Sequence, residues 1–406
     1  MHRVAMSGMG IVSSLGLGCD AVAGSLRRGR SGVALDPQRL DLGFSSALTG
    51  VIRDFTPSPL LTRKQRKTMP EFALWAHAAV AEALEMAGLA PADVANERTG
   101  LVFGSDSSCL APLELVETVR ARGLTQRIPS GMVFQGMTST VTLNLNAVLG
   151  VRGASWTVSA ACASSAHALG QAADLIALGR QDRVICGGAQ EITWQSMAGF
   201  DGIGAFSSRM DAPAKASRPF DAGRDGLVPS GGAAALVLER LDLARDRGAR
   251  VFGEVLAYDF SSDGASLSLP SREGLARAMA GALARAGLAP GDVDYVCAHA
   301  TSTPAGDAAE AEAIAQVFAG HAPAVSSLKS MSGHELWMSG ASQAVSCALM
   351  ARDGFIAPNL NLEAPDPAAA GLNLARETLP HPPRLAMCNA AGFGGTNACL
   401  LLGFAT

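Results

Sequence analysis

A cysteine that could act as a nucleophile lies in the segment TVSAACASSAHALGQAAD (residues 157–174), which is built almost entirely of small residues. Cys162 follows a strand-like pattern and precedes a helix-like one. The free N–H groups and the dipole at a helix N-terminus stabilise a thiolate, which is the reactive form of cysteine. A cysteine in apolar surroundings is more often only a small buried side chain, so this segment alone leaves both interpretations open.

A histidine with neighbouring hydroxyl groups lies in a second segment, CAHATSTPAGDAAEAEAI (297–314). His299 follows a strand-like run and precedes Thr301, Ser302 and Thr303, a setting that suits a polar substrate, although a lone histidine at a strand end is usually structural. Glu310 follows Asp307 by about one helical turn, so we expect one of these two carboxylates to point inward.

A lysine and a second histidine lie in a third segment, SSLKSMSGHELWMSGASQAVSCALM (326–350), where a serine-glycine turn leads into an apolar helix. Lysine is seldom buried without a partner. Lys329 is therefore expected on the surface, or inside and paired with Glu310, while His334 ends the turn.

A glycine turn forms the fourth segment, NAAGFGGTNACLLL (389–402), and its glycines let the backbone approach another group closely. It lacks the spacing and the following helix of a dinucleotide-binding loop. A simple tight turn between strands is the alternative.

The elements that must position these residues alternate between strand-like apolar runs and alanine-rich helical runs, which predicts an α/β architecture. Two pairs of similar segments occur in the same order. AGLAPADV (87–94) matches AGLAPGDV (286–293), and GGAAALVLE (231–239) matches GGTNACLLLG (394–403). These matches predict two copies of one unit, residues 1–249 and 250–406, whereas two unrelated α/β domains are the alternative.

Composition argues against several classes of protein. The 406 residues carry a net charge of −4, which gives no general attraction to nucleic acid. The N-terminus lacks the apolar core of a signal peptide and no segment suits membrane insertion, so a cytoplasmic protein is expected. None of the cysteines has the spacing of a zinc site, which predicts reduced thiols and no metal; they are Cys19, Cys109, Cys162, Cys186, Cys297, Cys347, Cys388 and Cys399.

Four segments taken in order, VSAACASSAHALG, HATSTPAGDAAEAEA, KSMSGHE and NAAGFGGTNA, resemble the signatures of the β-ketoacyl-acyl-carrier-protein synthases. These elongating condensing enzymes serve fatty-acid and type II polyketide synthesis. The resemblance covers essentially the whole chain, and GFIAPNLNLEAPDPAAAGLN is similar to the synthase I branch. It implies a thiolase fold with duplicated α-β-α-β-α layers, in a homodimer or in a heterodimer with a related chain-length partner.

The resemblance also implies roles for the four segments. Cys162 would take the acyl chain as a thioester, and His299 and His334 would promote decarboxylation of malonyl carrier protein. The backbone N–H groups of Cys162 and Phe393 would form the oxyanion hole, and Lys329 and Glu310 would complete the catalytic set. No resident cofactor is expected, because the phosphopantetheine arm arrives on the carrier protein, where it would be held by Thr301 and Thr303.

The acyl pocket and the carrier-protein dock follow from the same resemblance. Phe200 and Phe393 would gate or line the acyl channel, with Ser107 near its end. The carrier protein is acidic, and TRKQRK (62–67) is strongly basic, although such a run is usually only a solvated face. The predicted docking contacts are Arg63, Lys64, Arg66, Lys67, Arg127 and Arg209.

This chain departs from the family pattern at four places. Ala300 replaces a glycine, Trp337 and Met338 replace small residues, Gln343 replaces a glutamate and Ala391 replaces a phenylalanine. The bulk of Trp337 and the smaller Ala391 are expected to compensate each other in a reshaped acyl or malonyl pocket. Gln343 removes a negative charge near Lys329, which leaves Glu310 as the expected partner of that lysine.

Two other functions are alternatives to condensation. A chain-length partner subunit of a ketosynthase heterodimer typically lacks the nucleophilic cysteine, so Cys162 and both histidines argue against that role. A thiolase would carry a second active-site cysteine where this chain has His334. The sequence leaves acyl chain length and unsaturation open.

Overall fold

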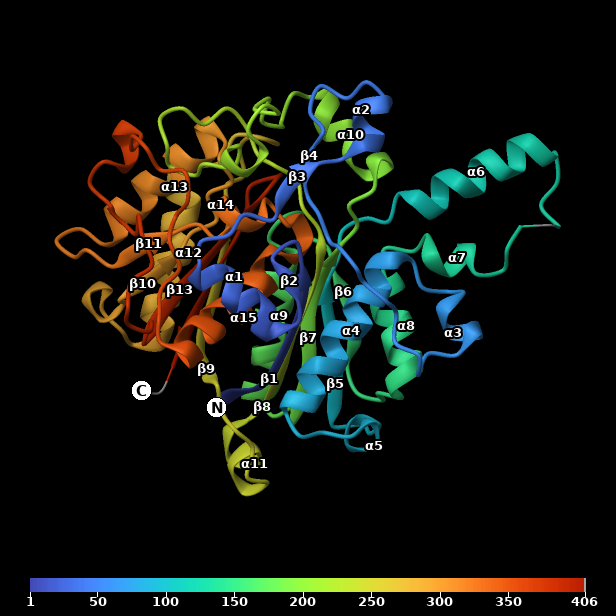
Figure 1. Cartoon of the computed structure of the whole chain (residues 1–406). Coiled ribbons are helices and arrows are strands. Elements are labelled where there is room, and N and C mark those ends of the chain that lie inside the picture. The colour runs from blue at the N-terminus through green and yellow to red at the C-terminus, as the bar shows by residue number, and fades with distance from the viewer. Residues whose placement is uncertain (127, 405–406) are drawn as a thin grey trace.

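The computed structural model describes residues 1–126 and 128–404 of the chain, which form alternating strands and helices (Figure 1). Two sets of five strands carry the architecture. The first set is β1 (Val4–Ser13), β5 (Thr99–Gly104), β6 (Ser155–Val158), β7 (Arg183–Gln190) and β8 (Gly232–Arg240). The second set is β9 (Gly253–Ser262), β10 (Tyr295–Cys297), β11 (Ala324–Ser326), β13 (Leu385–Gly392) and β14 (Thr396–Gly403).

The two sets have the same topology, which confirms the predicted duplication. Their strand orders are β6-β5-β7-β8-β1 and β11-β10-β13-β14-β9, so the strands of each half follow the same sequence of neighbours. In each half the first three strands in this order run parallel to one another, and the last two pairs of neighbouring strands are antiparallel. Antiparallel pairing of β1 with β9 joins the halves, and β12 (Asn373–Leu374) extends the second one beside β11.

Helices cover both sheets and fill the space between them, which gives the layered α/β arrangement. Helices α4 (Glu71–Met86) and α8 (Thr140–Leu149) pack on the outer face of the first half, and α12 (Arg272–Ala286) and α13 (Pro304–Val317) cover the second. Between the sheets lie α9 (Ser164–Ala177) and α15 (Ser339–Asp353), which contact each other and strands of both halves. The central layer therefore brings the two halves together.

The repeated sequence segments occupy equivalent places in the two halves. Helices α4 and α12 each connect the first and second strands of their half. Both helices end within two residues of the glycine in their repeated segment. Gly88 and Gly287 adopt left-handed φ angles of 66°, which terminates the helical hydrogen bonding. The boundary predicted at 249/250 lies in the connection between β8 and β9.

Shorter elements connect these layers. The first half contains β2 (Gly16–Leu17), α1 (Cys19–Arg27), β3 (Val33–Leu35), α2 (Pro37–Asp41), β4 (Leu48–Gly50), α3 (Arg63–Arg66), α5 (Pro91–Val94), α6 (Leu110–Arg122), α7 (Met132–Gln135), α10 (Trp194–Gly202) and η1 (Pro213–Lys215). Then follow α11 (Leu241–Asp246), η2 (Pro290–Asp292), α14 (Lys329–Ser332), η3 (Leu336–Met338) and η4 (Pro367–Ala369). Helices α6 and α7 extend away from the body of the molecule (Figure 1). In the described part of the chain, no helix combines the length and apolarity needed to cross a membrane.

Small residues allow the central helices to approach closely. A Cβ atom added to Gly340 of α15 would lie 2.5 Å from the backbone nitrogen of Ala166 in α9, and one added to Gly104 of β5 would lie 2.3 Å from the nitrogen of Ser165. Such distances are far inside van der Waals contact, so neither position accepts a side chain without backbone movement. The small residues around Cys162 thus serve the packing of α9.

We expect the substitution G340A to lower the free energy of unfolding by about 1–3 kcal/mol, because it overfills the contact between α9 and α15. Urea unfolding followed by circular dichroism measures this change. The matched control is G199A in α10, where an added Cβ meets nothing within 4 Å. That variant should be neutral or more stable by up to about 1 kcal/mol, since alanine favours the helix. Equal stability of the two variants would contradict the packing argument.

Candidate active site

Cys162 lies in a strained turn between β6 and α9. Ala161, directly before it, has a φ of 46°, which is rare for a residue with a side chain. Ser164 stabilises the turn, because its hydroxyl donates to the carbonyl of Ala161 at 2.6 Å and accepts from the backbone N–H of Ala160 at 2.8 Å. The thiol is only 6% exposed and sits at the start of α9, as the sequence predicted.

His334 meets this thiol from the other half of the molecule. Its Nε2 lies 3.1 Å from Cys162 Sγ, and its Nδ1 lies 3.3 Å from the hydroxyl of Ser339 at the start of α15. The backbone of His334 is held at both sides, donating to the carbonyl of Val228 at 2.7 Å and accepting from the N–H of Ser230 at 2.8 Å. The segment before β8 therefore fixes the imidazole over the thiol.

His299 is the second imidazole of the site. Its ring centroid lies 5.3 Å from that of His334, at an interplanar angle of 89°. The backbone N–H groups of His299 and Ala300 donate to the two oxygens of Glu310 at 2.8 and 2.6 Å. Helix α13 thus holds the loop that carries the histidine. In the described part of the chain, Nδ1 of His299 has no hydrogen-bond partner, so this nitrogen is left to bind a substrate.

Asp307 and Glu310 of α13 both point inward, whereas the sequence predicted that only one of them would. Asp307 is 1% exposed and accepts the backbone N–H groups of Thr301 and Ser302 at 2.9 and 3.1 Å. It also accepts the N–H of Phe220 at 2.9 Å and lies 3.6 Å from the guanidinium of Arg224. Together with Glu310, it fixes the backbone from residue 299 to 302.

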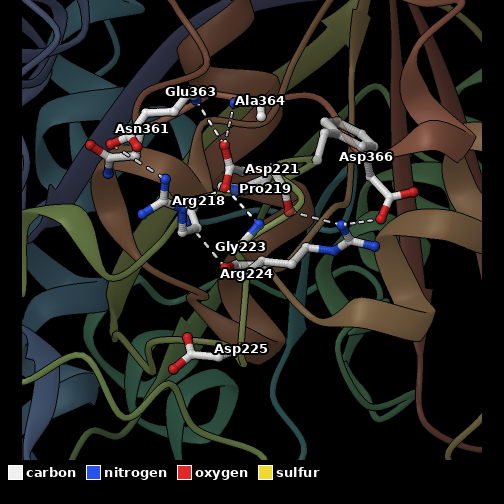
Figure 2. Close-up of polar contacts among 12 residues, drawn as sticks. Arg218, Pro219, Asp221, Gly223, Arg224, Asp225, Asn361, Glu363, Ala364 and Asp366 are labelled. Atoms are coloured by element: carbon white, nitrogen blue, oxygen red, sulfur yellow. Dashed lines mark hydrogen bonds and ion pairs between the residues drawn. The ribbon is translucent and has the colours of Figure 1, made fainter.

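A network that sequence reasoning missed supports this loop from behind (Figure 2). Asp221 accepts from the guanidinium of Arg218 at 2.8 Å and from the backbone N–H groups of Glu363 and Ala364. Arg224 pairs with Asp366 at 2.8 Å and donates to the carbonyls of residues 303 and 304. The run SRPFDAGRDG (217–226) could have indicated this network, because two arginines and two aspartates in a short stretch are costly to bury unless they pair.

Burial dominates the electrostatics of the site. It raises the pKa of the Cys162 thiol to about 12, and this rise is opposed by the charge of Lys329 and by the backbone N–H groups of Cys162 and Phe393. The N–H groups at this helix end favour the thiolate, but loss of solvent outweighs their effect. Burial and the charge of Lys329 lower the pKa of both His299 and His334 well below the usual value, so both imidazoles are neutral at pH 7.

Lys329 is buried without the predicted ion pair. Its side chain is 3% exposed, and its Nζ has no hydrogen-bond partner among residues 1–126 and 128–404. The predicted partner, Glu310, instead accepts two backbone N–H groups and the side-chain amide of Asn389. Gln343 turns its amide NH₂ toward the carbonyls of Cys297 and Ala298. Burial lowers the pKa of Lys329, and the negative charges of Glu310 and Glu335 oppose this effect.

A cavity of about 890 Å³ opens onto these residues. Its wall includes Cys162, His299 and His334, and the hairpin turn after β13 contributes Phe393, which is 45% exposed. The lining also contains the predicted arm-binding residues Thr301 and Thr303, whose hydroxyl oxygens lie 3.1 Å apart, and Phe200 and Ala391. The structure thus brings both histidines, both threonines and the glycine turn to one cavity.

Two predicted pocket residues lie outside the wall of this cavity. Ser107 is half-buried beside Cys109. Trp337 is 7% exposed and belongs to an apolar cluster with Cys162, and its ring centroid lies 6.4 Å from that of Phe200. Phe200 in turn lies 6.1 Å from Phe393. No contact between Trp337 and Ala391 is observed among the described residues, so their mutual compensation stays a prediction.

The basic run that the resemblance predicts as a docking surface lies on and directly after α3. Arg63, Lys64, Arg66 and Lys67 are all exposed, and a capping box between Thr62 and Gln65 begins the helix. Arg209 is half-buried and already engaged, since it donates to the carbonyl of Gly223 at 2.6 Å and lies 3.8 Å from Asp225. Arg127 lies outside the described residues.

Three buried cysteines meet behind the site, although no zinc-like spacing links them in the sequence. The sulfur atoms of Cys297, Cys347 and Cys388 lie within 4.8 Å of one another, so among the described residues they form the group with the geometry to hold a metal ion. They come from β10, α15 and β13 and are at most 1% exposed within the apolar core. They pack as small polarizable side chains.

Comparison with known proteins gives a consistent result over the whole chain. The family description "Beta-ketoacyl synthase, N-terminal domain" matches residues 1–244, and "Beta-ketoacyl synthase, C-terminal domain" matches residues 252–363. The 3-oxoacyl-[acyl-carrier-protein] synthase 1 of Haemophilus influenzae is 40% identical over 404 residues, which cover 99% of this chain and 98% of that protein.

Solved structures agree with this similarity. A β-ketoacyl synthase from Burkholderia phymatum superposes with a TM-score of 0.95 at 36% identity, with 100% of both chains covered. The ishigamide ketosynthase/chain length factor superposes with a TM-score of 0.91 at 31% identity, again with 100% of both chains covered.

The raised pKa of Cys162 predicts its reactivity. We expect the rate of alkylation by iodoacetamide to rise about tenfold per pH unit from pH 7 to 9 without a plateau, because the thiolate fraction is small throughout this range. Intact-protein mass spectrometry of a C109S variant measures this rate while removing the one half-buried cysteine elsewhere. The C109S/C162S variant is the control. A plateau of the alkylation rate below pH 8 would show that Cys162 and His334 form a thiolate–imidazolium pair.

Proposed function

Since this chain belongs to the β-ketoacyl synthase family, we propose that it catalyses the decarboxylative condensation of an enzyme-bound acyl thioester with malonyl-acyl carrier protein. The product is a 3-oxoacyl chain two carbons longer, in fatty-acid or type II polyketide synthesis. The observation that carries this proposal is the meeting of Cys162 with His334 at 3.1 Å, beside His299 in one cavity. This arrangement argues against a non-catalytic partner subunit.

The first half-reaction loads the acyl chain onto Cys162. His334 accepts the thiol proton, and the sulfur attacks the thioester carbonyl of the acyl carrier protein. The C–S bond to Cys162 forms, the bond to the phosphopantetheine sulfur breaks, and that sulfur leaves with a proton. The backbone N–H groups of Cys162 and Phe393 both act on the sulfur, so they are placed to stabilise the oxyanion beside it. Such donors need no reorganisation during the reaction.

The second half-reaction breaks one C–C bond and forms another. Malonyl carrier protein loses CO₂, which leaves an enolate whose negative oxygen requires donors. The neutral imidazoles of His299 and His334 each carry one N–H group, and the charge of Lys329 adds electrostatic stabilisation. The enolate carbon then attacks the acyl thioester, and Cys162 leaves as a thiolate, which takes up a proton from solvent. Thr301 and Thr303 are proposed to bind the arm of the carrier protein, so no resident cofactor is required.

The protruding elements suggest where a second subunit binds. Helices α6 and α7 and the edge strand β6 present exposed apolar side chains that isolated monomers seldom leave uncovered, namely Leu113, Val116, Val133, Phe134, Met137 and Trp156. We propose that this face forms a homodimer, or a heterodimer with a related chain-length partner. All eight cysteines are free, which supports a reducing compartment, and we propose the cytoplasm.

Acylation tests the proposed function directly. After incubation with acyl-carrier protein carrying a saturated chain, the mass of the protein should rise by one acyl group, and peptide mapping should place that group on Cys162. The variant C162S should show no thioester, whereas C399S, which removes another buried thiol, should be acylated normally. A wild-type protein that folds but takes up no acyl group from a panel of chain lengths would favour the partner-subunit role.

Reversing charge on α3 tests carrier docking. We expect R63E/K64E to raise KM for acyl-carrier protein about tenfold, because charge complementarity guides association, while leaving turnover of a small thioester mimic unchanged. The control R245E/R250E reverses two exposed arginines on and after α11. Equal losses for the carrier-bound and small substrates would contradict a docking role for α3.

A further inference from the structure

The buried charge of Lys329 requires compensation. In the described part of the chain its Nζ meets no hydrogen-bond acceptor, and no carboxylate oxygen lies within 4.0 Å of it. A buried ammonium group without nearby negative charge is unstable. The titratable groups that face Lys329 and the two histidines are Cys162, Cys297, His299, Glu310, His334 and Glu335.

The charge of Glu310 also acts on Lys329, but its carboxylate is held by other donors and makes no ion pair with the lysine. Its two oxygens accept the N–H groups of His299 and Ala300 and the side-chain amide of Asn389, at 2.6 to 3.0 Å. These donors hold its carboxylate toward the loop that carries His299. Gln343 brings no charge, and its NH₂ group donates to two backbone carbonyls.

Glu335 is the remaining carboxyl group. It directly follows His334 and is 4% exposed, and among the described residues its Oε1 has no hydrogen-bond partner. The hydroxyl of Ser342, on α15, donates to the carboxyl group. Lys329, His334 and Glu335 all belong to the short segment that begins α14 and turns at Gly333 into η3. A negative charge at position 335 acts on the lysine and raises its pKa.

We propose that Glu335 is a positioning residue that supplies the counter-charge of Lys329, and that through Lys329 it sustains enolate stabilisation at neutral and alkaline pH. This inference rests on the proposed condensing activity. The ionised carboxylate keeps Lys329 protonated. The charged lysine then keeps both imidazoles neutral and stabilises the enolate oxygen. Glu335 itself need not touch the substrate.

The electrostatics of Glu335 give this role a pH range. Burial raises its pKa to about 7, and the hydrogen bond from Ser342 and the charge of Lys329 act against that rise. The carboxyl group is therefore largely protonated at pH 6 and largely ionised at pH 8.5. Removal of its negative charge therefore has little effect on the decarboxylation rate at pH 6. At pH 8.5 the same removal lets Lys329 lose its proton more readily.

The test is the pH profile of malonyl-carrier-protein decarboxylation, measured as CO₂ release, for wild type and E335Q. We expect E335Q to match wild type within about twofold at pH 6 and to fall about tenfold below it at pH 8.5. E335D, which keeps the charge, should retain most of the activity at pH 8.5. The control E312Q removes an exposed carboxylate of α13 and should leave the profile unchanged.

The variant E335D separates charge from fold. If E335Q does not fold, E335D carries the test, because it keeps the carboxylate in the same segment. A folded E335D that falls about tenfold below wild type at pH 8.5 contradicts the inference. Identical profiles for wild type and E335Q overturn the role of Glu335 while leaving condensation intact. Absence of decarboxylation in the wild type would instead overturn the proposed function.

Discussion

The close contact between α9 and α15 is the constraint on which the active site depends. Cys162 comes from the first half and His334 from the second, and their 3.1 Å separation requires the helices that follow them to pack almost backbone to backbone. Gly340 against Ala166 allows this approach, and Gly104 lets β5 support α9 from the other side. Larger side chains at these positions would separate the nucleophile from its base before they affected the chemistry of either residue.

Burial of polar groups is the second determinant of the site's geometry. The buried carboxylates bind backbone N–H groups as well as charged side chains. Glu310 and Asp307 use their oxygens to hold the loop from 299 to 302, and the network around Asp221 and Arg224 holds that loop from behind. Strain is concentrated in the same region, since Ala161, Phe220, Ser302 and Leu336 all adopt left-handed φ angles. The surrounding hydrogen bonds keep these residues in conformations that a flexible loop would leave.

Much of this arrangement could be predicted from the sequence because it depends on local patterns. The repeated segments predicted the duplication, and the order of the four polar segments predicted which side chains share a cavity. The surroundings of Lys329 could not be predicted. The carboxylate of Glu310 could bind either an ammonium group or backbone N–H groups, and only the fold brings the N–H groups near it. The meeting of Cys297, Cys347 and Cys388 was missed for a similar reason, since three elements distant in sequence contribute one thiol each. The balance between burial and the helix end at Cys162 could not be judged from neighbouring residues, because it depends on the segments that cover the thiol.

The matching topology of the two halves gives Trp337 a further meaning. Cys162 lies two residues before the first residue of α9, and Trp337 lies two residues before the first residue of α15, the equivalent helix of the second half. The indole thus fills the pseudosymmetric counterpart of the nucleophile position. A duplicated scaffold offers two such helix ends, and here one is closed by a bulky apolar ring. The two halves therefore share a strand topology but differ in the side chain that each places at this helix end.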